Sequence, residues 1–305
     1  MMRSLYSGVS GLRTHQVRMD VIGANLANVN TVGFKCSRVT FRDVLYQTAK
    51  NPAMPTDAPM LRGGTNPSQI GLGVQVASID VLNTKAGPML TDRPYDLYID
   101  GEGYFQVLDG ASGIYYYTRV GDFQFVPITS DTGENRVALM DGNGNFVMGM
   151  LLDGEAEYNP DGLEDDGSFD REMLNIIEIA EFYKYTQIRI GVDGIITGYD
   201  TSAAEGENPI KYLGQIMMTK FLNNDGLTQV GNTYLLPSVS SGSPVAYAPG
   251  FGGTGSTITS RLEMSNVELS KEFTDMIITQ RGFQANSRII TVSDEMLQEL
   301  VNLKR

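Results

Sequence analysis

The stretch from residue 261 to residue 303 has an apolar residue at every seventh position. The members of this heptad register are Leu262, Leu269, Met276, Phe283, Ile290 and Leu297. Gly282 is the only Gly or Pro in the stretch, so the spacing predicts one uninterrupted helix. Such a helix would be about 65 Å long, whereas a compact domain of about 200 residues has a radius of gyration of about 17 Å. Other chains are needed to cover its apolar stripe, and the chain is therefore predicted to be a polymer subunit.

The positions that a two-stranded coiled coil would fill with a second set of apolar residues are polar in this stretch. They are Ser265, Glu272, Thr279, Asn286 and Ser293. Further apolar residues widen the stripe on the other side, namely Phe273, Ile277, Ile289, Met296, Val301 and Leu303. The stripe is suited to contact several neighbours, and we expect the polar seam to let them slide past one another.

The first thirty residues repeat this pattern in a shorter form. Leu5, Leu12, Met19 and Leu26 again step by seven, which predicts a second amphipathic helix. Gly8 and Gly11 would allow another helix to approach closely. The lone His15, at the edge of the apolar face, is interpreted as a packing residue without special chemistry. We expect the two helices to pair antiparallel as a coiled-coil-like inner domain made from residues 1–34 and 256–305.

Charge and composition exclude several classes of function. The net charge of −13 is concentrated in the middle, because residues 1–48 carry +4 and residues 261–305 carry −1, leaving −16 for residues 49–260. Nucleic acid would be repelled by this acidic middle. One histidine and one cysteine, Cys36, leave almost nothing for His-dependent catalysis, an intrachain disulfide or a multi-cysteine metal site. The chain has neither an apolar run of about eighteen residues nor a signal-peptide pattern, so we expect no membrane insertion.

The middle of the chain has the periodicity of β-structure. Residues 86–255 contain short β-branched and aromatic runs separated by turn signals, including a hairpin over 188–197 with Asp193-Gly194 at its turn. Residues 35–85 are rich in Pro, Gly, Asn and Thr and are predicted to form an extended linker, with a short helix or strand around Phe41 to Tyr46. The fold class is therefore α+β, with an antiparallel sandwich or barrel-like outer domain.

No motif in the chain marks an enzyme, a cofactor site or a metal site. Residues 153–181 are strongly acidic, and Asp141 begins a run that resembles a calcium loop, but Phe146 and Leu152 occupy the positions of its Gly and Glu. A second register starting at Asp161 also departs from that pattern. A solvated acidic face is the favoured interpretation, although acidic β proteins always offer carboxylate pairs of the kind that glycosidases use. The glycines at 63–73 lack the Lys and Ser/Thr of a phosphate loop.

Two motifs at opposite ends of the chain resemble the bacterial flagellar rod and hook family. The first is the stretch 23–35, GANLANVNTVGFK, which includes Asn25, Asn28, Asn30, Gly33 and Phe34. The second comprises Leu262-Glu263-Met264-Ser265-Asn266-Val267 and the later run with Gln280, Arg281 and Asn286. Ala24 departs from the family pattern, which usually has a second Asn there. The phrase at residues 63–74 and the stretches 35–41 and 281–286 are similar to hook members. The modest length and the phrase at 41–47 also suit a distal rod subunit.

The resemblance implies a structural function without a cofactor. It implies a subunit of the flagellar hook, a tubular and bendable joint that transmits torque from rod to filament and is exported through the flagellar type III apparatus. It also implies that the partners are other copies of the chain, the distal rod protein, the hook cap protein, the hook–filament junction protein and the hook-length control protein. A hypothesis from another class is a secreted oligomeric β protein that binds a ligand or calcium.

Overall fold

The computed structural model describes residues 2–55, 63–129, 135–152, 168–169, 174–201 and 209–303. By internal contacts the chain divides into two units. We call residues 1–29, 36–82 and 267–305 the helical unit, and residues 30–35 and 83–266 the β unit. The sequence assigned residues 36–82 to a linker and residues 256–266 to the helices. The acidic segment at 153–181 lies largely outside the described residues.

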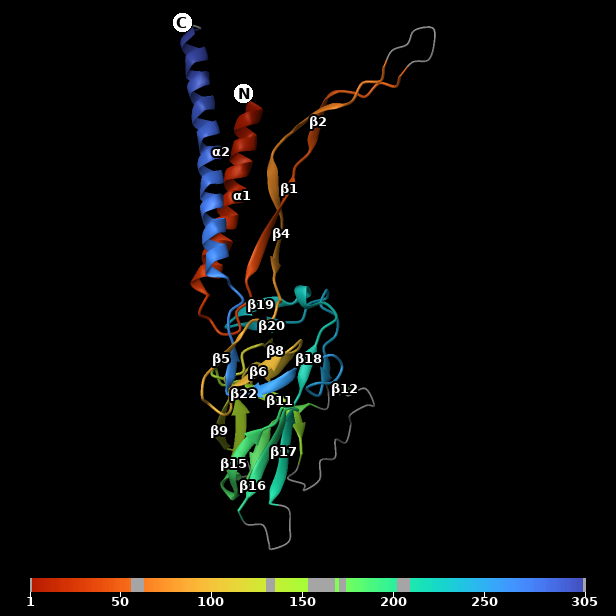
Figure 1. Cartoon of the computed structure of the whole chain (residues 1–305), viewed down its shortest axis with the longest axis vertical. Coiled ribbons are helices and arrows are strands. Elements are labelled where there is room, and N and C mark those ends of the chain that lie inside the picture. Colours follow the sequence, from red (N-terminus) through yellow and green to blue (C-terminus); the bar gives the residue numbers. More distant parts are fainter. Residues whose placement is uncertain are drawn as a thin grey trace. The chain divides into compact units, whose positions relative to one another are not determined.

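The helical unit contains two long helices that run side by side in opposite directions. Helix α1 covers Met2–Ala27 and α2 covers Leu269–Leu303, and both chain termini lie at the same end of the pair (Figure 1). At the end of α1 the side-chain amide of Asn28 donates to the carbonyl of Ala24 at 2.9 Å. The backbone amide of Asn28 donates to the same carbonyl at 3.2 Å, so Asn28 bonds the last turn of the helix through both its backbone and its side chain.

The second helix begins eight residues later than the sequence predicts. Residues Arg261–Glu263 form strand β23, which pairs with strand β5 (Pro88–Leu90), and the backbone of Ser260 has a φ of 60°. The left-handed backbone of Ser260 is incompatible with a helix that starts there. The pairing of β23 with β5 satisfies the backbone amides and carbonyls of residues 261–263, so these groups do not need the hydrogen bonds of a helix. The prediction of a helix over 261–268 was therefore wrong.

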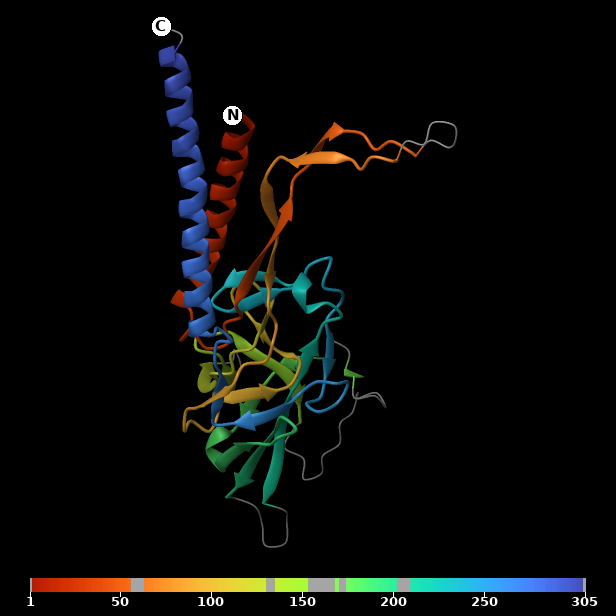
Figure 2. The same ribbon diagram turned by 45° about the horizontal axis from the view of Figure 1, so that its top comes forward.

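A long two-stranded antiparallel ribbon completes the helical unit (Figure 2). Strand β1 (Ser37–Asp43) pairs with β4 (Val74–Val81), and β2 (Tyr46–Lys50) pairs with β3 (Ser68–Gly71). The strand alternative for the stretch around Phe41 is thus correct. All residues of β2 and β3 are exposed, whereas the β1–β4 part packs against α1.

The β unit is built on one branched antiparallel sheet. All strand pairs in its described residues are antiparallel, and the predicted hairpin at 188–197 is formed by β15 and β16. The remaining strands are β6 (Leu97–Asp100), β7 (Tyr104–Leu108), β8 (Tyr115–Thr118), β9 (Gln124–Thr129), β10 (Asn135–Met140), β11 (Phe146–Leu151), β12 (Ser168–Phe169), β13 (Asn175–Ile176), β14 (Glu178–Ala180), β15 (Tyr185–Ile190), β16 (Ile195–Asp200), β17 (Ile210–Ile216), β18 (Met218–Lys220), β19 (Thr228–Gly231), β20 (Tyr234–Leu236), β21 (Val245–Tyr247) and β22 (Ser256–Thr259).

Aromatic and branched aliphatic side chains from the sheet fill the core of the β unit. The largest fully buried side chains are Tyr98, Tyr117, Phe105, Phe123, Leu97, Ile99, Leu139, Ile177, Ile196, Ile216, Met217 and Met218. Phe105 and Phe123 meet edge to face with ring centroids 5.0 Å apart, the arrangement that the charge distribution of aromatic rings favours. This core supports the α+β class with a large antiparallel β region.

Candidate assembly surface and motif junction

Polar residues are buried on α2 where it packs against α1. The buried residues of α2 are Glu272, Thr279 and Ser293, three of the positions that the sequence marks as a polar seam. The hydroxyl groups of Thr279 and Ser293 donate to backbone carbonyls of their own helix, at 2.7 Å in both cases. Because these hydroxyls find partners inside α2, they can be buried without an unpaired polar atom and make no directional bond to α1.

Small residues let the two helices approach closely at this seam. A Cβ atom placed on Gly11 would lie 2.7 Å from the Asn286 side chain, and one on Gly282 would lie 2.7 Å from the His15 ring. At such distances the Asn286 or His15 side chain would have to shift, so glycine at these positions lets the two helices approach closely. An ion pair of 2.8 Å between Arg18 and Asp275 lies farther along the seam.

Many large apolar side chains of α2 are exposed to solvent. We call this set the assembly surface: Leu269, Phe273, Ile277, Ile278, Phe283, Ile289, Val292, Met296, Leu300, Val301 and Leu303, all of them exposed. So many exposed large apolar side chains on one helix are uncommon on a monomer, and exposed apolar patches are common at interaction sites. In the part of the chain that the structure describes, neither helix has the length and apolarity needed to cross a membrane.

The predicted heptad residues do not form one surface. Leu269 and Phe283 belong to the assembly surface, and Met276, Ile290 and Leu297 are half-buried. On α1, Leu5, Leu12, Met19 and Leu26 are also half-buried. Leu262 lies in strand β23, where it is buried in the β unit. It is therefore not a helix residue, because the strand pairing with β5 takes precedence over the heptad spacing.

The motif asparagine Asn25 fixes the start of the ribbon to α1. Its side chain is buried, donating to the carbonyl of Ser37 and accepting from the Ser37 amide, each at 2.9 Å. A single amide thus closes the turn between helix and strand. Gln280 and Arg281 are exposed, and Asn30 lies in the exposed turn after α1.

Gly33 and Phe34 bring the first motif alongside the second inside the β unit. The amide of Gly33 donates to the carbonyl of Glu263 at 2.8 Å, and the carbonyl of Phe34 accepts from the Asn266 amide at 3.4 Å. Gly33 has a φ of +68°, and a Cβ on it would lie 2.6 Å from the Val120 side chain. A residue with a side chain would be strained and would clash at this position.

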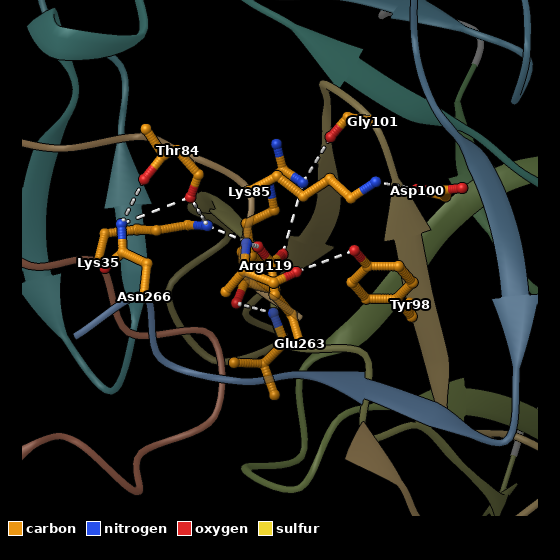
Figure 3. Close-up of polar contacts among 12 residues, drawn as sticks. Lys35, Thr84, Lys85, Tyr98, Asp100, Gly101, Arg119, Glu263 and Asn266 are labelled. Carbon is orange, nitrogen blue, oxygen red and sulfur yellow. Dashed lines mark hydrogen bonds and ion pairs between the residues drawn. The ribbon is translucent and has the colours of Figure 1, made fainter. Parts of the chain in front are cut away.

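A buried carboxylate with two buried cations lies at this meeting point (Figure 3). We call Lys35, Arg119 and Glu263 the ion cluster. The Lys35 ammonium lies 2.6 Å from Glu263 Oε1, and an Arg119 guanidinium nitrogen lies 3.5 Å from Glu263 Oε2. The three side chains are at most 8% exposed. A buried charge is tolerated only with partners of this kind, so the cluster fixes the two motifs against each other.

Backbone and side-chain groups of neighbouring segments complete the coordination of the ion cluster. Lys35 also donates to the carbonyl of Thr84 at 2.8 Å, Arg119 to that of Gly101 at 2.8 Å, and the amide of Ala86 donates to Glu263 at 3.0 Å. The Tyr98 hydroxyl donates to the carbonyl of Ala86, and burial raises the pKa of Tyr98. The cluster therefore binds the segment at 84–86 as well.

Three chain crossings between the two units begin close to these residues. Lys35, Thr84 and Asn266 each lie within two residues of a place where the chain leaves or enters the β unit. Asn266 donates to the Thr84 hydroxyl at 2.9 Å. The sequence singled out Gly33, Phe34 and the surrounding motifs but missed Arg119, Thr84 and the pairing of Lys35 with Glu263. The one sequence feature that could have predicted the Lys35–Glu263 pair is the opposite charge of these two residues, each of which lies in a motif of the same family.

The resemblance to a calcium loop at 141–145 has a different structural explanation. One carboxylate oxygen of Asp141 accepts from the amides of Asn143 and Asn145, each at 2.9 Å, and the other accepts from the Tyr234 hydroxyl. The carboxylate thus closes its own turn. Among the residues that the structure describes, no three His, Cys, Asp or Glu side chains are grouped so as to hold a metal ion.

Comparisons with known proteins agree with the two motifs and the β unit. A family model described as "Flagella basal body rod protein" matches residues 5–35, one described as "Flagellar hook protein FlgE/F/G D1 domain" matches residues 98–198, and one described as "Flagellar basal body rod FlgEFG protein C-terminal" matches residues 258–303. These matches define the class of protein, a structural component of the bacterial flagellum.

Individual relatives match over the whole chain. The chain is 43% identical over 306 residues to the flagellar basal-body rod protein FlgG of Bacillus subtilis, with both chains fully covered. The chain is also 33% identical over 306 residues to the rod protein FlgG of Borreliella burgdorferi. It is 30% identical over 447 residues to the hook protein FlgE of the same organism, and both alignments cover the two chains fully. The chain belongs to the flagellar rod and hook family.

Proposed function

We propose that this protein polymerises through the assembly surface into a tube, and that the tube is the flagellar hook. The observation that carries the proposal is the number of large apolar side chains of α2 that are exposed to solvent, although the buried residues of this helix are the polar Glu272, Thr279 and Ser293. Removal of apolar area from water at about 25 cal/mol per Å² would drive copies together. Identical contacts that do not close on themselves extend a helical assembly, with the terminal helices forming its inner wall.

Hook identity is supported by sequence and by the polar seam. The stretches 35–41, 63–74 and 281–286 are similar to hook members, and full-length relatives named FlgE match the chain. Seam hydroxyls that bond only their own helix would allow helices to shift along one another at low cost in free energy, as bending of a torque-transmitting tube requires.

A distal rod subunit is the second candidate. It is favoured by the 43% identity to a protein of nearly the same length that is named FlgG, whereas the alignment with the Borreliella FlgE extends over 447 residues. Under either function the expected partners are further copies of this chain, and the proposed neighbours are the distal rod, hook cap and hook–filament junction proteins. We also propose contacts with the hook-length control protein and the flagellar export apparatus.

The test is electron microscopy of the purified protein, alone and with polymer fragments added as seeds. Phe283→Asp should abolish tube formation because it places a charge in an apolar contact. Gln284→Asp is the matched control, since it adds the same charge to the neighbouring exposed position outside the assembly surface. Normal tubes from Phe283→Asp, or equal loss in both variants, would contradict the assembly surface.

Tube shape separates the two candidates. Curved tubes are expected for a hook, and straight tubes that never curve would support the distal rod instead. Seeded wild-type protein that stays monomeric would contradict both.

A further inference from the structure

The single histidine of the chain lies where three elements of the helical unit meet. His15 projects from α1, its ring abuts Gly282 of α2, and it meets Phe41 of β1 edge to face at 5.8 Å. Its Nδ1 atom is buried and has no hydrogen-bond partner among the described residues. A neutral imidazole with an unprotonated Nδ1 can occupy this place, whereas an imidazolium would bury an N–H donor without an acceptor.

The charges around His15 also oppose its protonation. Arg18 lies one turn farther along α1, with its guanidinium 5.7 Å from the centroid of the same Phe41 ring. Burial, and then the charge of Arg18, lower the pKa of His15. The carboxylate that α2 contributes nearby, Asp275, is already paired with Arg18 at 2.8 Å.

The charged side chains of the ribbon have partners of their own. Arg38 pairs with Asp80 at 3.5 Å, and Asp43 interacts with Tyr46. Arg42 is positioned to bind the Gln75 amide. Among its described residues, the ribbon therefore offers His15 the ring of Phe41 as its contact, and its carboxylates Asp43 and Asp80 are engaged with other groups.

We propose that His15 is an acid-sensitive latch, and that protonation of its imidazole in mild acid weakens the contacts of α1 with α2 and with the β1–β4 ribbon. The sign follows from linkage. The unfolded state takes up the proton near pH 6.5 and the folded state only at lower pH, so the contacts are complete above pH 6.5 and weaken as pH falls below it. Most carboxylates titrate near pH 4, so the range between pH 5 and 6.5 reports on this residue.

The experiment is amide hydrogen exchange of the full-length protein between pH 7.5 and 5.0, corrected for the intrinsic pH dependence of exchange. We expect exchange in residues 8–18, 37–43 and 278–286 to accelerate by up to about tenfold per pH unit below pH 6.5, because one proton is taken up on opening. Peptides from the β unit provide the internal reference. The His15→Gln variant should lack this acceleration, because its amide does not titrate.

A second measurement does not depend on how well the variant folds. The chain has one histidine, so one imidazole Cε1–H resonance follows its titration in the wild-type protein. A midpoint below 6.5 is expected. A midpoint at or above 6.5, or an acid response that His15→Gln retains, would overturn the proposal.

Discussion

Glu263 shows how one residue can connect distant parts of a chain. Its carboxylate balances two buried cations, and its main-chain carbonyl accepts from Gly33. Periodicity and composition do not reveal such a pairing, because Lys35 and Glu263 are 228 positions apart. The two motifs identified the family from both ends of the chain, but they did not predict that residues of the two motifs contact each other inside the β unit.

Removal of the Glu263 charge should destabilise the β unit strongly. Glu263→Gln keeps the shape of the side chain but leaves Lys35 and Arg119 buried without a counter-charge, and we expect a loss of about 3–5 kcal/mol in the free energy of unfolding. Urea denaturation of the wild-type protein and the variant measures this change in the free energy of unfolding. Glu102→Gln is the matched control, because Glu102 pairs with Lys220 on the surface, and such pairs contribute about 0–1 kcal/mol. Equal losses in the two variants would contradict the role of the ion cluster.

Asp122 is a carboxylate whose charge opposes folding. Burial, and then the nearby charge of Asp141, raise its pKa, so the folded state binds its proton more readily than the unfolded state. Its contribution to stability is therefore present at low pH and is lost as pH rises through the folded pKa. Asp122→Asn should raise the urea midpoint at pH 7 and flatten its dependence on pH.

Asp109 provides a control of opposite sign for Asp122. Hydrogen bonds from the Ser112 hydroxyl and the Ala111 amide lower the pKa of Asp109. Its contribution is present at neutral pH and is lost as pH falls, so Asp109→Asn should lower the midpoint at pH 7. If the two variants shift the midpoint in the same direction, the assigned causes are wrong.

At the scale of elements, the sequence predicted the type of most helices and strands, but it predicted the residues at which they begin less well. Heptad spacing found α2, but it could not show that Arg261–Glu263 pair with Pro88–Leu90, because that competition depends on a distant strand. Alternation and turn residues predicted the hairpin at 188–197. The ribbon at 37–81 has low β-propensity in its outer part, and only pairing between its two strands reveals it.

We expect even one added methyl group at Gly282, in the seam between α1 and α2, to destabilise the helical unit. Gly282→Ala gains about 1 kcal/mol of helix propensity, but its Cβ would lie 2.7 Å from the His15 ring, so we expect a net loss of stability in the helical unit. Gly23→Ala is the control, because Gly23 is exposed on α1 with no atom within 4 Å of an added Cβ. It should stabilise by up to about 1 kcal/mol. Thermal melting followed by circular dichroism at 222 nm compares the two, and a gain for Gly282→Ala would show that the seam has room.

At the scale of the whole molecule, each unit has an organisation that composition already suggested. The ends of the chain carry +4 and −1 and supply the helices, while most of the acidic middle belongs to the β unit. Charge distribution could indicate this division because like charges discourage close packing between copies. It could not show that the chain passes between the units several times, since that follows from strand pairing and from the ion cluster.

The ion cluster predicts which bonds a pulling force on the β unit would load first. Segments 33–35 and 263–266 are bonded directly to each other, so we expect a pull between residues 35 and 266 to load those bonds before the chain between them. We expect single-molecule stretching between these two points to give one rupture whose force falls in Glu263→Gln. An unchanged force would mean that the sheet carries the load. If the protein carries torque as proposed, repeated loading would strain a few buried bonds in each subunit and spare its largest folded part.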